Sequence, residues 1–148
     1  MDSVAFSLRV TAPDPDVARV SAGRRQFSIG KPLEFDETSP HIAAIEYALG
    51  AVGGEVVNGL RAFANRRRLP IDDVEAVVSA TLEHGLTYLE VIGEQGHPRI
   101  ARIHIKVFVT APDVVAIRTV FDHMLVPLPL VCTLRAALAL TTELIPAL

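Results

Sequence analysis

The sequence contains a single cysteine, Cys132, among its 148 residues, so a disulfide bond within one chain is impossible. It also has no excess of basic residues, and its net charge of −3 provides no general attraction to nucleic acid or to an anionic membrane. The longest apolar run, residues 124–134, is too short to span a bilayer and is interrupted by two prolines. The first residues contain no basic segment followed by an apolar run, so we expect no signal peptide and a cytoplasmic location.

Metal and cofactor signals are missing as well. The five histidines show no metal-ligand spacing and have no cysteine partners, so we predict no metal site. His104 lies between Arg102 and Lys106 on a predicted strand face and is most simply a solvated residue. The glycine-rich segment 50–54 lies inside a predicted helix rather than after a strand, so it is no phosphate loop and we expect no cofactor.

Apolar residues are abundant. They make up 50% of the chain, and the mean hydropathy is +0.37. A length of 148 residues is typical of one domain, so we predict a single domain over residues 1–148. So apolar a composition indicates a buried interface between copies of the chain.

The central segment 39–68 predicts one long helix. Ser39 suits the N-cap, Pro40 suits the first helical position, and Leu69-Pro70 ends the pattern. One face carries apolar residues three or four apart, namely Ile42, Ile45, Leu49, Val52, Val56, Leu60 and Phe63. The other face carries Gly50, Gly53 and Gly54, which favours the close approach of another backbone. A helix that is apolar all round is typical of a buried element.

Alternating apolar residues on both sides of this helix predict strands over 3–12, 17–29 with a bend near Gly23, 74–82, 86–92 and 101–109. Loops are predicted over 30–38 and 93–98. Further helices are predicted over 112–125 and from Pro129 to about residue 145. The order of strands, helix, strands and two helices indicates an α+β fold.

Two segments resemble the OsmC-like proteins, a family that includes the organic hydroperoxide resistance proteins of the oxidative stress response. The first is Ile45-Glu46 followed by Ala51-Val52-Gly53-Gly54 and Leu60-Arg61-Ala62-Phe63-Ala64. The second is Leu128-Pro129-Leu130-Val131-Cys132-Thr133-Leu134. The resemblance implies antiparallel sheets around a long central helix, an intertwined homodimer and a site at the subunit boundary.

The family's chemistry depends on two cysteines, one that attacks the peroxide and one that resolves the sulfenic acid. At the matching positions this chain has Glu55 and Leu128, which perform no thiol chemistry. Glu55 is either an exposed residue at the border of the apolar face or a buried carboxylate in the former thiol pocket. The resemblance therefore predicts the fold, while the missing cysteines argue against a peroxidase.

Other candidate site residues lie near these positions. Cys132 falls near the start of a predicted helix, where the helix dipole favours a thiolate, although an ordinary, partly exposed cysteine is the plainer interpretation. Glu46 matches a family glutamate that partners an arginine. Arg24 or Arg25 is the candidate for that arginine, and a purely structural ion pair is equally consistent with the sequence.

Two functions follow from these features. The first is a non-peroxidatic homodimer that binds a small apolar or anionic ligand, without nucleic acid or membrane partners. The second is a hydroperoxide reductase that acts through Cys132 and an external reductant. The replacement of both family cysteines favours the first function.

Overall fold

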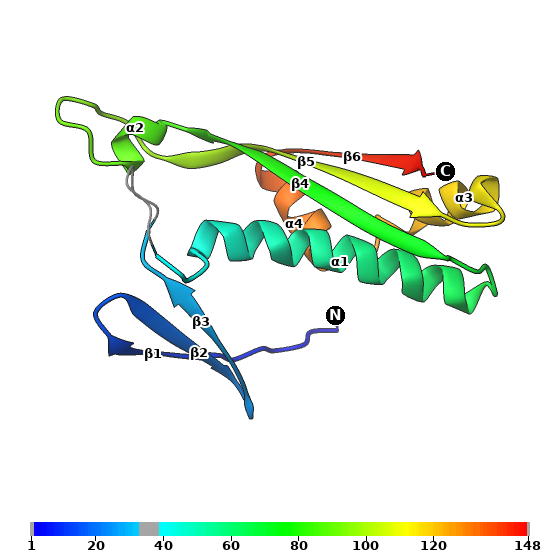
Figure 1. Cartoon of the computed structure of the whole chain (residues 1–148), viewed down its shortest axis with the longest axis horizontal. Helices are drawn as coiled ribbons and strands as arrows, with labels where there is room; N and C mark the ends of the chain where they lie inside the picture. The colour runs from blue at the N-terminus through cyan, green and yellow to red at the C-terminus, as the bar shows by residue number, and fades with distance from the viewer. Residues whose placement is uncertain (1, 33–38, 148) are drawn as a thin grey trace. The chain divides into compact units, whose positions relative to one another are not determined.

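The computed structural model describes residues 2–32 and 39–147 of the chain (Figure 1). They form two compact units, Met1–Ala48 and Leu49–Leu148. The long helix α1, Ala44–Arg66, begins in the first unit and belongs from Leu49 onward to the second. The α+β class is confirmed, while a single domain over residues 1–148 stays a prediction.

The first unit contains an antiparallel sheet in the order β1-β2-β3. Its strands are β1 (Arg9–Asp14), β2 (Val17–Ala22) and β3 (Arg25–Gly30). The predicted bend between β2 and β3 is confirmed, because Gly23 adopts a positive φ of 64° there. The strand predicted over 3–12 is wrong in its first half, since residues 3–8 lie outside any strand. Most of the predicted 30–38 loop, residues 33–38, lies outside the described residues.

Helix α1 starts later than the sequence pattern predicts. Ala43 forms a parallel bridge with Gly30, whose N–H donates to the carbonyl oxygen of Ile42 at 2.8 Å. This extended pairing holds residues 42 and 43 outside the helix, and Ser39 instead accepts a hydrogen bond from the N–H of His41. The cap comes from Glu46, whose Oε1 accepts from the N–H of Ala43 at 3.0 Å, as in one half of a capping box.

The second unit is built on a sheet in the order β4-β5-β6 (Figure 1). Strand β4 (Asp73–Glu83) pairs antiparallel with β5 (Arg99–Thr110), and β6 (Ala139–Pro146) pairs parallel with β5. The alternation predicted for β5 is confirmed. Its buried face consists of Ile103, Ile105, Val107 and Val109, whereas Arg102 and Lys106 on the other face are exposed.

Two predicted elements are wrong. The last helix, α4, covers only Pro129–Ala137, and the residues predicted to continue it form β6. Leu140 and Leu144 have spacings compatible with both periods, and the parallel partner β5 selects the strand. The strand predicted over 86–92 is instead the short helix α2, Gly85–Tyr88, followed by turns.

Helix α1 and α3, Val114–Met124, supply much of the rest of the core, to which Val131 of α4 and the leucines of β6 also belong. Val52, Val56 and Leu60 on α1 are fully buried, as are Ile117 and Met124 on α3. A Cβ atom at Gly53 would lie only 2.6 Å from Cγ2 of Val78, so this glycine admits a side chain of β4 rather than another backbone.

The glycines on the rest of that helix face have open surroundings. A Cβ atom at Gly50 or Gly54 would meet no atom within 4 Å. No single helix in residues 2–32 and 39–147 is long and apolar enough to cross a membrane; only α3 and α4 taken together pass on length and composition, with a bend of 65° between them.

Candidate functional site

The side chain of Glu55 lies at the start of helix α4, where it binds backbone N–H groups. Its Oε1 accepts from the N–H of Leu130 at 3.0 Å and from that of Val131 at 3.1 Å, and Oε2 accepts from Leu130 at 3.1 Å. Leu128 at the N-cap has no side-chain acceptor of its own, so Glu55 supplies the missing cap across 75 residues of sequence. An anion at this end of the helix is also favoured by the helix dipole.

Leu128 packs against the same face of α1, one turn beyond Glu55. It is buried, with 7% of its surface exposed. A Cβ atom at Gly59 would lie 3.0 Å from Cδ2 of Leu128 and 3.2 Å from the sulfur of Met124, so α1 and the α3–α4 connection touch closely here. The structure thus brings Glu55, Leu128 and the start of α4 together, and Leu128 forms an apolar contact there.

Cys132 is exposed and lies on the first turn of α4. Its thiol donates a hydrogen bond to the carbonyl oxygen of Val126 at 2.8 Å. The thiolate is the nucleophilic form of cysteine, and forming it here removes this hydrogen bond.

Glu46 is exposed at the start of α1, where its carboxylate caps the helix through Ala43. Arg24 and Arg25 are exposed at the turn between β2 and β3. Within the described part of the chain, neither arginine forms an ion pair with Glu46. Their pairing stays a prediction.

His104 has more partners than the sequence indicates. Its Nδ1 lies 2.6 Å from Oγ1 of Thr141, and its Nε2 lies 3.4 Å from Oε2 of Glu143. Both partners lie on β6, the strand that the sequence predicts as helix. The histidine is half-buried on the outer sheet face, beside a hollow that Ser79, Arg102 and Thr141 also line.

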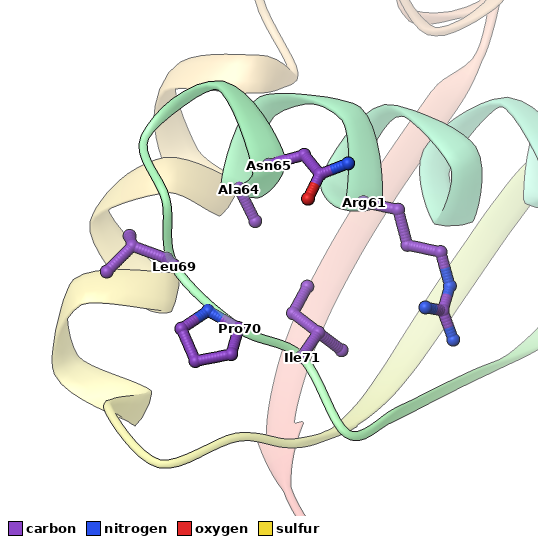
Figure 2. Close-up of a pocket in the computed structure, with 6 residues that line it drawn as sticks. All are labelled: Arg61, Ala64, Asn65, Leu69, Pro70 and Ile71. Carbon is purple, nitrogen blue, oxygen red and sulfur yellow. The ribbon is translucent and has the colours of Figure 1, made fainter.

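A pocket of about 260 Å³ lies at the C-terminal end of α1 (Figure 2). Its walls come from the helix and from the segment that follows it. The lining residues are Arg61, Ala64, Asn65, Leu69, Pro70 and Ile71. Sequence reasoning missed this pocket, although Arg61 and Asn65 are four residues apart and therefore share one helix face. Among the described residues, no group of three or more His, Cys, Asp or Glu side chains could hold a metal ion.

No family model and no curated protein matches the sequence. Solved structures do match. An OsmC-like protein from Mycoplasma pneumoniae is 12% identical with a TM-score of 0.78, covering 100% of both chains. An organic hydroperoxide resistance protein OsmC from Legionella pneumophila is 8% identical, with a TM-score of 0.71 over 97% of this chain and 99% of that one.

A third solved structure, the organic hydroperoxide resistance protein OhrB of Bacillus subtilis, is 16% identical, with a TM-score of 0.66 over 94% of this chain and 98% of that one. These identities establish the fold alone. The chain has the OsmC-like fold, as its sequence segments predict.

Proposed function

We propose that this chain is a non-peroxidatic member of the OsmC-like family that forms a homodimer and binds a small apolar or anionic ligand. The observation that carries the proposal is the carboxylate of Glu55, the residue that the family resemblance matches to the attacking thiol. It is bound to the N–H groups of Leu130 and Val131. A carboxylate held in this way stabilises the junction of α1 and α4 and offers no sulfur to a peroxide.

The second half of a thiol cycle is also missing. Leu128 stands at the resolving position, and its side chain fills the space above Gly59. The chain's one thiol, Cys132, has no second cysteine with which to form a disulfide. A sulfenic acid formed on Cys132 would lack an internal partner and would be open to over-oxidation.

Apolar side chains in the N-terminal segment support the homodimer. Val4, Phe6, Leu8 and Val10 are exposed by 80%, 89%, 58% and 62%. Four exposed apolar side chains within seven residues are open to contact with another surface, and a second copy of the chain would cover them. An obligate interface of this class buries on the order of 2,000 Å² or more.

The exposure of Cys132 supports one alternative function. An accessible thiol near a helix start is compatible with a hydroperoxide reductase that uses an external thiol as reductant. This alternative requires Cys132 to give up its hydrogen bond to Val126 and to react without help from Glu55.

A peroxide-consumption assay separates the two functions. Purified wild type and Cys132→Ser are mixed with cumene hydroperoxide and a dithiol reductant, beside a two-cysteine protein of the same fold as positive control. We expect wild type to consume peroxide no faster per thiol than free glutathione, and Cys132→Ser to lose only this background.

Rapid turnover by wild type that Cys132→Ser abolishes would contradict the proposal and establish the reductase. The homodimer is tested separately, by sedimentation at micromolar concentration. A monomer there would remove the dimer from the proposal.

A further inference from the structure

The pocket at the C-terminal end of α1 has the size of a small metabolite. Its volume is about 260 Å³. That is below the range of about 300–1,000 Å³ that drug-sized ligands need, so a ligand here is a short molecule.

One wall of the pocket carries the exposed hydrogen-bond donors of two side chains. Arg61 and Asn65 lie one turn apart on α1 (Figure 2). Both side chains are exposed, and within residues 2–32 and 39–147 neither has a hydrogen bond or an ion pair to another residue, so both can contact a ligand from solvent. A free guanidinium is the group that binds a carboxylate through two parallel hydrogen bonds.

The negative end of the helix dipole would oppose an anion here, but its carbonyl groups are already occupied. The carbonyl oxygen of Ala64 accepts from the N–H groups of Arg67 and Leu69, and that of Phe63 accepts from Nη1 of Arg67. The Arg66 and Arg67 guanidinium groups also lie 5.1 and 5.6 Å from the centre of the Phe63 ring. These cations offset the dipole at the pocket.

The facing wall is apolar. Pro70 and Ile71 lie across the hollow from Ala64 and Asn65 (Figure 2). A ligand that satisfies both walls therefore has one anionic end and a short aliphatic body.

We propose that this pocket binds a short-chain aliphatic carboxylate, with its carboxylate on Arg61 and Asn65 and its chain against Pro70 and Ile71. This inference rests on the ligand-binding part of the proposed function, for which it supplies a ligand class and a site separate from Glu55.

The test is a titration of the ¹⁵N-labelled protein with butanoate, hexanoate and octanoate, followed by amide NMR. Matched controls are the alcohols with the same chains and inorganic phosphate. We expect hexanoate to shift the amide signals of Asn65 and Ile71, and we expect the matching alcohol and phosphate to bind at least tenfold more weakly.

Arg61→Gln should weaken hexanoate binding by roughly tenfold or more, because a charged hydrogen bond is lost. Arg135→Gln, which removes the same charge from α4, should leave it unchanged.

Other results would overturn the inference. Equal binding of hexanoate to wild type and to a folded Arg61→Gln would move the ligand elsewhere and leave the proposed function standing. Tighter binding of phosphate than of any carboxylate, or no binding by any carboxylate, would also overturn it. The peroxide assay does not involve Arg61, so failure of the non-peroxidatic proposal is recognised independently.

Discussion

The two sheets of this chain bury their side chains very differently. In the β4-β5-β6 sheet, β5 alone contributes four hydrophobic residues that are at most 2% exposed. In the β1-β2-β3 sheet, Val20 is the one fully buried hydrophobic residue among those that the structure describes. The second unit thus contains its own core, whereas most apolar side chains of the first unit are exposed. Under the proposed function, a second copy of the chain covers them.

The largest effect should come from disrupting the exposed apolar side chains of the N-terminal segment, which the proposed dimer would bury. Replacing Phe6 and Leu8 together by glutamate should weaken self-association by roughly 100-fold or more, because each side chain contributes about 1.5–3 kcal/mol when buried. Sedimentation equilibrium measures the change. Ile92→Glu is the control, since Ile92 is 100% exposed in the β4–β5 connection. If the double variant dimerises as tightly as this control, the N-terminal segment does not form the interface.

A smaller effect should distinguish Gly53, which packs against the core of the second unit, from Gly54 on the open face of the same helix. Gly53→Leu should lower the free energy of unfolding by about 1–3 kcal/mol, since its Cβ atom would already collide with Val78. Gly54→Leu, one residue on, enters open space and should weaken the dimer, with a smaller loss of unfolding free energy than Gly53→Leu at the same protein concentration. Urea denaturation and sedimentation distinguish the two. Equal loss of unfolding free energy in both variants would contradict this difference.

Individual elements show which parts of the fold can be predicted from the sequence. Strand β5 was predictable because one buried face imposes strict alternation on consecutive residues. Strand β6 was mistaken for helix because its leucines fit both periods and its partner lies 37 residues away in the sequence. The start of α1 depends on the pairing of Ala43 with Gly30, and no local pattern contains that contact.

In the candidate site too, short sequence segments predicted residue positions, whereas contacts between distant segments were not predicted. Glu55 and Leu128 were identified by their positions in two sequence segments, and the structure places both at the junction of α1 and α4. The capping role of Glu55 was not predicted, because its partners follow 75 residues later. One signal was available: a helix that begins Leu128-Pro129 has no side-chain acceptor at its own N-cap.

That junction yields the third prediction. Glu55→Gln should lower the free energy of unfolding by about 1–2 kcal/mol, because the amide keeps one acceptor oxygen and loses the charge at the helix start. Amide hydrogen exchange at Leu130 and Val131 should become faster. Glu94→Gln is the control, since the Glu94 side chain has no partner in the described part of the chain. Unchanged stability and exchange would show that the carboxylate does not cap α4.

The smallest effect belongs to the other capping glutamate, in the first unit. Glu46 accepts one hydrogen bond, from Ala43, whereas Glu55 accepts three. Glu46→Gln retains an acceptor for that single bond and loses only the charge near the start of α1, so unfolding should become easier by about 0.5 kcal/mol. Denaturation at one fixed protein concentration measures it, because dimerisation contributes to stability. A loss for Glu46→Gln equal to or larger than that for Glu55→Gln would assign Glu46 a further partner, for which Arg24 and Arg25 are the candidates.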